Sequence, residues 1–164
     1  MSEGPVNFGK PLFIIVLAGV IGGGYYAYNH WPAHYDGAGY SVDFPHKWTV
    51  TPTADTDVPK VQARGPLLDE NAGYGWVTVN VHGTIIWPDY VIQRIPAPDW
   101  HEVIEIDYKK SVIFTCNDGD NRIIGVGVER GDAVVICVVG CPKPFFDQNR
   151  AVMEKAVRSL RCQR

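Results

Sequence analysis

The sequence predicts an α+β protein: a single N-terminal transmembrane helix, followed by an antiparallel β-sheet domain with a C-terminal helix packed on it. Three observations lead to this prediction. A run without charged side chains extends from Pro11 to Tyr28. Short β-branched runs separated by turn residues fill the middle of the chain. An amphipathic pattern with helical spacing covers Phe145–Leu160.

The uncharged run has the length of a membrane span. Its eighteen residues would extend roughly 27 Å as a helix, close to the ~30 Å hydrocarbon core of a bilayer. A cleavable signal peptide needs small residues at its cleavage site, whereas the candidate position here, Tyr25–Ala27, carries bulky rings. We therefore expect a retained anchor over residues 11–29, preceded by a tail of residues 1–10.

Basic residues next to the span set its expected orientation. Lys10 lies just before the run, and the next basic residue is Lys47. Because cytoplasmic flanks carry the excess of Lys and Arg, the N-terminus is expected in the cytoplasm. The protein is thus predicted to be a single-pass membrane protein whose globular domain is periplasmic or lumenal.

Small residues on the span predict helix packing. Gly19 and Gly23 form a G-x-x-x-G pair, and Gly22 follows Ala18 at the same spacing. Small residues four apart let a neighbouring helix approach closely. We expect a partner helix, a pigment or a lipid at this face. The alternative is that glycine is common in membrane helices anyway.

The rest of the chain is one domain without a nucleic-acid signature. Residues 30–38 are expected to form a turn-rich neck, and residues 39–164 suffice for a single core. The chain has 15 basic and 18 acidic residues, a net charge of −3 at pH 7. This balance argues against binding to a phosphate backbone.

The first half of the domain is expected to be mostly strands and loops. Tyr40–Phe44 alternates apolar and polar residues, Pro45 breaks the run, and a second strand starts at Trp48. Thr51–Tyr74 is expected to be irregular, with one short strand. Gly75–His82 alternates cleanly and is predicted as a strand.

Two adjacent segments are harder to assign. Trp87–Pro98 contains three prolines, so we predict an exposed loop suited to docking. Asp99 and Glu102 have the spacing of a capping box and predict a helix that ends near Lys110. The β-branched residues in that segment leave a strand as the alternative.

The second half is predicted to be a meander closed by a helix. Strands are expected over Ser111–Cys116, Arg122–Glu129 and Asp132–Val139, with turns at the glycines between them. The last strand is apolar on both faces, which is typical of a central position. The helix over Phe145–Leu160 is expected to lay its apolar residues on the sheet.

All four cysteines lie in the last third of the chain. In an oxidising compartment an even number of cysteines favours pairing. Two residues of one strand four positions apart lie ~13 Å apart, beyond disulfide reach, which excludes Cys137–Cys141. Bridges Cys116–Cys141 and Cys137–Cys162 are the expectation, and buried thiols are the alternative.

The sequence shows no recognisable catalytic or cofactor motif. His30 and His34 lie near Asp36, but Pro32 argues against a regular helix that would present both as metal ligands. There is no nucleophile elbow, P-loop or haem attachment motif. We expect a protein that is not an enzyme, without a motif for a cofactor or metal.

The start of the domain resembles a known family. The pattern of Gly39–Val50, with Pro45 and Trp48 in a Pro-x-x-Trp arrangement, is similar to the opening of the PsbP-like family. The order of the later elements, from the meander to the helix Ala151–Leu160, also matches. The resemblance implies a PsbP-like sandwich and an extrinsic, non-catalytic role on a photosynthetic membrane. The chain departs from that family in its predicted anchor and its late cysteines.

These observations lead to a functional expectation. We expect an accessory subunit that stabilises a membrane energy-transducing complex, with integral membrane subunits and the lipid bilayer as partners. A photosynthetic reaction-centre or antenna assembly is the favoured host. Alternatives are a free membrane-anchored binding module, a respiratory-complex subunit or a thiol-redox protein. The expected partner contacts are five aromatic residues, namely Trp31, Tyr35, Trp87, Tyr90 and Trp100. For each of them, a place in the core or at the membrane interface is the alternative.

Overall fold

The computed structural model divides the chain into two compact units, Met1–Trp31 and Pro32–Arg164. The described residues are 19–20, 23, 31–37, 39–53, 61–66, 72–81, 98–131 and 133–163. In the first unit, Gly19, Val20 and Gly23 are helical. Among the described residues no helix has the length and apolar character to cross a membrane. Most of the predicted span, Gly22 included, lies outside them.

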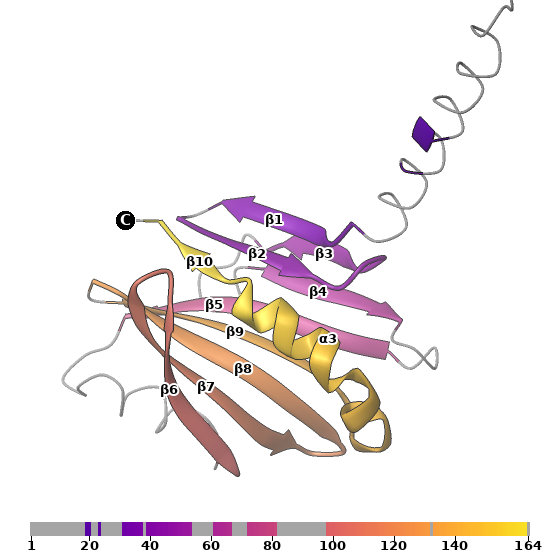
Figure 1. Ribbon diagram of the computed structural model, residues 1–164. Helices are drawn as coiled ribbons and strands as arrows, with labels where there is room; N and C mark the ends of the chain where they lie inside the picture. Colours follow the sequence, from indigo (N-terminus) through magenta and orange to yellow (C-terminus); the bar gives the residue numbers. More distant parts are fainter. Residues whose placement is uncertain are drawn as a thin grey trace, which may run out of the picture. The chain divides into compact units, whose positions relative to one another are not determined.

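A seven-stranded antiparallel sheet dominates the second unit (Figure 1). Its strands run in the order β3-β4-β5-β9-β8-β7-β6. Their bounds are β3 Thr49–Pro52, β4 Val61–Pro66, β5 Ala72–Val81, β6 Trp100–Ile106, β7 Lys109–Asp118, β8 Asn121–Arg130 and β9 Ala133–Pro142. The fourth position belongs to β9, which is buried along almost its whole length.

A smaller sheet and a helix lie on one face of this large sheet. The small sheet has the order β1-β2-β10, formed by β1 (Ala33–Gly37), β2 (Tyr40–Phe44) and β10 (Arg161–Cys162). A 3-10 turn, η1 (Lys143–Phe145), leads into the helix α3 (Phe146–Arg158). In Figure 1 the helix crosses in front of β8 and β9, and it also contacts β2.

The alternation of side chains along the strands creates two apolar clusters. In β9, Val135, Cys137 and Val139 belong to the large cluster under α3 and the small sheet. Val134, Ile136 and Val138 point to the opposite face. There they join a second buried cluster with four residues of β7 and β8, namely Val112, Phe114, Cys116 and Ile123. The absence of polar alternation in β9 is therefore explained by burial on both faces.

Most predicted elements of the second half are confirmed. The meander has the expected order, with each strand longer than predicted. The helix α3 buries Phe146, Met153, Ala156 and Val157. Val152, expected on the same apolar stripe, is 43 % exposed.

The predicted helix from Asp99 to Lys110 is wrong, because the segment forms β6 and the start of β7. The Asp99 carboxylate does not cap a helix. It accepts a hydrogen bond from the Thr115 hydroxyl at 2.5 Å and pairs with Arg122 at 2.7 Å. Asp107 and Tyr108 both have positive φ, 52° and 61°, which is the conformation of a two-residue hairpin turn. Cross-strand pairing has overridden a local capping pattern.

The pairing of the first strands also differs from the expectation. Tyr40–Phe44 and the strand after Trp48 both exist, but β2 pairs with β1 and β10, whereas β3 pairs with β4. The turn at Pro45 therefore leads from one sheet to the other. Residues 30–38 were expected to be a turn-rich neck, but they contain β1. The sequence analysis also missed β10.

Candidate partner-docking surface

The structure places three of the five predicted contact residues. Trp31 is 67 % exposed and Trp100 is 40 % exposed. Tyr35 is half-buried, with its ring centroid 5.7 Å from that of Tyr40, so it belongs partly to the core. Trp87 and Tyr90 lie outside the described residues.

Trp100 is the first residue of a largely exposed outer strand. We use the term β6 edge for Trp100–Ile106 together with the turn residue Tyr108. Val103 is 56 % and Tyr108 is 94 % exposed. Trp100 and Val103 lie three residues apart on the strand, so their exposed side chains face opposite sides of the sheet. Sequence analysis did not predict Val103 and Tyr108 as exposed contact residues, because it placed both on one face of a helix.

A polar anchor holds the start of the β6 edge. The Arg122 guanidinium lies over the Phe146 ring of α3, 5.1 Å from its centroid, while it also pairs with Asp99. The Asp99 backbone N–H donates to the carbonyl of Thr115 at 3.0 Å. Contacts to β7 and β8, and through Arg122 to α3, thus hold the residue before Trp100.

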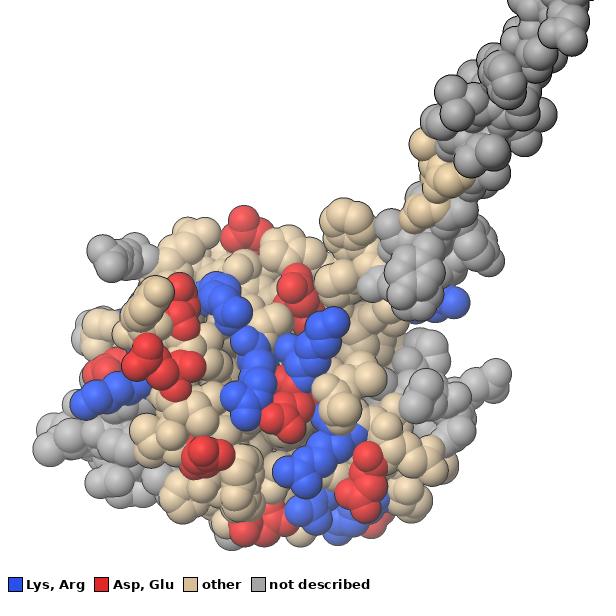
Figure 2. Space-filling model, viewed as in Figure 1, with Lys and Arg blue, Asp and Glu red and all other residues tan. Residues whose placement is uncertain are grey.

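Charge on the visible face is mixed in sign. In Figure 2, basic and acidic side chains lie interspersed over the face that carries α3. The exposed side of the helix has this composition, and Arg158 pairs with Glu154 at 2.8 Å. A mixed surface of this kind differs from the single-sign surface that binds a phosphate backbone.

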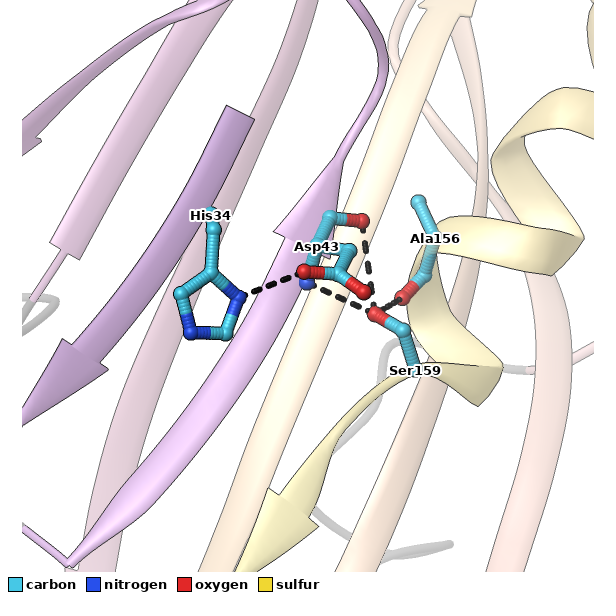
Figure 3. A network of polar contacts seen from close by, with 4 residues as sticks. All are labelled: His34, Asp43, Ala156 and Ser159. Atoms are coloured by element: carbon cyan, nitrogen blue, oxygen red, sulfur yellow. Dashed lines mark hydrogen bonds and ion pairs between the residues drawn. The ribbon is translucent and has the colours of Figure 1, made fainter. Parts of the chain in front are cut away.

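A histidine, an aspartate and a serine meet between β1, β2 and the end of α3 (Figure 3). The His34 ring nitrogen Nδ1 lies 2.6 Å from the Asp43 carboxylate. The Ser159 hydroxyl accepts a hydrogen bond from the Asp43 backbone N–H at 2.7 Å and donates to the Ala156 carbonyl at 2.6 Å. The three residue types are those of a hydrolase triad, so their geometry decides the interpretation.

The geometry differs from that of a catalytic triad. In a catalytic triad the imidazole accepts the hydroxyl proton of the serine. Here Figure 3 shows that Ser159 contacts only backbone groups, with the Asp43 side chain between it and His34. The serine therefore joins the end of α3 to β2, and the His34–Asp43 pair is a half-exposed cross-strand contact.

The four cysteines are free and buried. Burial raises the pKa of the Cys116 thiol to about 11. It also raises the pKa values of Cys137, Cys141 and Cys162 above the usual thiol range. A thiolate is the form that attacks or exchanges, so these groups are held in the unreactive protonated state at neutral pH.

The two expected disulfides are absent from the structure. Cys116 belongs to the second cluster and Cys141 to the large one, so their side chains point to opposite faces of the sheet. Cys137 and Cys162 share the large cluster but lie on different sheets as separate thiols. The Cys116–Cys141 bridge is ruled out by the strand register, which the sequence alone does not reveal.

A cleft of about 380 Å³ opens beside β4 and β5. Register pairs Arg64 with Tyr74 and Gln62 with Trp76, so these four side chains lie on one face. Asn121 of β8 also lines the cleft. The Tyr74 hydroxyl donates a hydrogen bond to Asp118 at 3.0 Å. Burial is the main cause that raises the pKa of this tyrosine, and the hydrogen bond is the second. Sequence analysis did not predict this cleft, although Trp76 on the polar face of its strand was a signal.

The histidines do not gather into a metal site in the described part of the chain. Within it, no group of three or more His, Cys, Asp and Glu side chains is placed to hold a metal ion. His34 and Asp36 both lie exposed on β1, and His34 is paired with Asp43. His30 lies outside the described residues.

Comparison with solved structures identifies the fold. The chain is similar to CyanoP, the cyanobacterial PsbP of Synechocystis sp. PCC 6803, with a TM-score of 0.59 and 8% sequence identity, over 81% of this chain and 93% of that one. A PsbP-like α+β fold, expected from Gly39–Val50 and the order of elements, is confirmed. At this identity the likeness concerns the fold alone.

Two further solved structures have lower similarity. A protein of unknown function from Pseudomonas aeruginosa has a TM-score of 0.49 at 12% identity, covering 82% of this chain and 99% of its own. A protein from Bacteroides thetaiotaomicron also has a TM-score of 0.49, at 11% identity, covering 83% of this chain and 49% of its own. No protein-family model and no curated protein sequence matches the chain.

Proposed function

We propose that this chain is a non-catalytic, membrane-anchored accessory subunit that stabilises a large membrane energy-transducing complex. The observation that carries the proposal is the exposed aromatic side chain of Trp31, a predicted contact residue that is 67 % exposed. Burying such side chains against a partner stabilises a complex by roughly 25 cal/mol per Å² of apolar area.

The fold supports the choice of host. The neighbour CyanoP is a cyanobacterial PsbP, and a photosynthetic reaction-centre or antenna assembly is the host we favour on that analogy. The argument is one of fold, and fold alone does not determine function. A respiratory complex is the second choice of host.

The anchor is proposed to bind neighbours through its glycines. A Cβ atom added at Gly19 or Gly23 would meet no atom within 4 Å, so this chain leaves both positions open. Larger side chains there would not disturb the chain itself, yet they would hold a neighbouring helix, pigment or lipid at a distance. The domain is proposed to lie on the periplasmic or lumenal side.

Co-purification tests the proposal. The native complex is extracted in mild detergent, separated by native electrophoresis, and examined for this chain in stoichiometric amount. A Gly19→Leu, Gly23→Leu variant is expected to dissociate from the complex, whereas the matched Val20→Leu variant on the same helix stays bound. A wild-type chain that migrates alone would refute the accessory role.

Buried thiols give a simple test of orientation. Because all four native cysteines are buried and protonated, they provide an unreactive background. An Asp120→Cys variant places one thiol in an exposed turn. We expect a membrane-impermeant maleimide to label it from the periplasmic or lumenal side, and labelling only from the cytoplasmic side would reverse the proposed topology.

The cleft beside β4 and β5 favours a second function, a membrane-anchored binding module for a small ligand. Arg64 supplies a positive charge, Trp76 a flat apolar surface, and Gln62 and Asn121 polar groups. This is the composition of a pocket for a planar anionic molecule. A screen of small carboxylates and phosphates by tryptophan fluorescence, with Arg64→Gln as the control, would separate this function from the first.

A further inference from the structure

The large sheet has two edges that differ sharply. At one edge, β3 is four residues long and contains Pro52, which has no N–H to offer. At the other edge, β6 is seven residues long and contains no proline. Short strands and prolines are two of the usual protections against edge-to-edge pairing. The β6 edge lacks both.

Alternate backbone groups of β6 point away from the sheet. Ile106 and Lys109 flank the two-residue turn and are register partners. In such a hairpin the flanking pair exchanges hydrogen bonds, and every second pair along the ladder does the same. The backbone groups of His101, Val103 and Glu105 are therefore directed outward, and all three residues are exposed.

The outward residues are complementary to themselves. When two β6 strands meet antiparallel with Val103 opposite Val103, His101 of each strand lies opposite Glu105 of the other. No other register forms this pair, because the other registers place His101 and Glu105 opposite Val103 or opposite their own copies. Opposite-charge or hydrogen-bonding pairs at such positions stabilise a sheet.

We propose that β6 pairs with β6 of a second copy of this chain, which joins the two seven-stranded sheets into one continuous sheet. Val103 lies at the two-fold axis, with a His101–Glu105 pair on each side of it. This homotypic contact goes beyond the accessory role and does not depend on it. A C2 interface of this kind is isologous, since the same patch serves both copies.

Trp100 and Val103 both meet apolar partners in the same register, one on each face of the sheet. Trp100, 40 % exposed, lies opposite Ile106 of the second copy, and Glu102 lies opposite Ile104. At each end of the paired strands, Asp99 of one copy lies opposite Asp107 of the other. The ion pair between Asp99 and Arg122 of the same copy offsets the charge of Asp99. The pairing thus buries the exposed parts of Trp100 and Val103 against apolar side chains.

The first test removes the central backbone donor. The full chain in detergent micelles is examined by sedimentation equilibrium, and a dimer is expected. Val103→Pro removes an outward N–H that β7 does not use, so the hairpin tolerates it. We expect the dissociation constant to rise at least about a hundredfold. Val103→Thr keeps the N–H and the branched shape, and is expected to remain dimeric.

The second test exchanges the charges. Glu105→Lys alone places Lys opposite His101, and His101→Glu alone places Glu opposite Glu105, so each is expected to weaken the dimer about tenfold. The double variant restores an opposite-charge pair and is expected to recover dimerisation. Glu105 also lies opposite Lys110 of β7, so thermal unfolding of each variant is measured alongside.

Three results would overturn the inference. The first is a wild-type chain that is monomeric at every concentration tested. The second is a dimer that persists in Val103→Pro but dissociates in the Gly19→Leu, Gly23→Leu variant, which would assign association to the anchor. The third is a double charge variant as weak as the single ones. Because co-purification with a host complex is measured separately, this failure is distinguishable from failure of the accessory role.

Discussion

The two faces of the seven-stranded sheet are both apolar, but they are packed by different means. The first face receives an amphipathic helix and a small sheet, and its cluster extends from Tyr40 to Cys162. The second face has a compact cluster of seven side chains around Phe114. There, glycines in neighbouring strands make room for large residues, since a Cβ at Gly125 would lie 2.3 Å from the Phe114 ring. The first face packs against an added layer, and on the second face the absence of a side chain at Gly125 makes room for the Phe114 ring.

The largest expected effect compares one buried phenylalanine on each face. Phe114, 1 % exposed, belongs to the second cluster, and Phe146, 2 % exposed, belongs to the first. We expect Phe114→Ala and Phe146→Ala each to lower the free energy of unfolding by about 3–5 kcal/mol. Chemical denaturation of the full chain measures both. A cost below about 1 kcal/mol for Phe114→Ala would show that the second face is not a true core.

Glycine substitutions are expected to have a smaller effect on both faces. Besides the Phe114 contact, a Cβ at Gly125 would lie 3.0 Å from the Cys137 carbonyl, and one at Gly75 would lie 2.8 Å from the Phe44 ring. Gly125→Ala and Gly75→Ala should each cost about 1–3 kcal/mol by overpacking. The pair Gly125→Ala, Phe114→Leu should recover part of the loss, and simple additivity of the two costs would contradict the proposed fit.

Alkaline pH is expected to weaken the second face through Cys116. Its folded pKa of about 11 lies above that of an exposed thiol, so the folded state holds the proton more tightly. The stabilisation is fully present below about pH 9 and is lost as the pH rises towards 11. Unfolding free energies measured across this range should fall by about 1–2 kcal/mol more in the wild type than in Cys116→Ala. Equal slopes would show that Cys116 is not buried.

The smallest effect is expected at the hydroxyl that joins α3 to β2. Ser159→Ala removes the acceptor for the Asp43 backbone N–H, which should cost about 1 kcal/mol. Ser159→Thr retains a hydroxyl and serves as the matched control. A loss of several kcal/mol would mean that the end of the helix depends on this residue more than its geometry indicates.

Sequence analysis succeeded where a signal is local and periodic. The double-sided apolar run of β9, the turns of the meander and the stripe of α3 each repeat within a few residues, so periodicity was sufficient. It failed at β6, where a capping pattern at Asp99 and Glu102 competed with pairing to β7. The signal of β-branched residues was present, but only the partner strand decided between the two.

The short strands and the candidate surfaces were missed for a related reason. β10 has two residues and pairs with β2, more than a hundred positions earlier, so nothing near Arg161 indicates it. The cleft needs Arg64 and Tyr74 to be register partners, and the β6 edge needs β6 to be an outer strand. Such properties arise from the order of strands. Expected contacts such as Trp87 and Tyr90 lie outside the described residues.

The pairing of β10 with β2 has a consequence for biosynthesis. The central strand of the small sheet has neighbours from both extremes of the domain, with Arg161 opposite Ser41 and Cys162 opposite Tyr40. The small sheet therefore cannot close until β10 has left the ribosome. A domain completed by a strand so late in its sequence stays open for most of its synthesis.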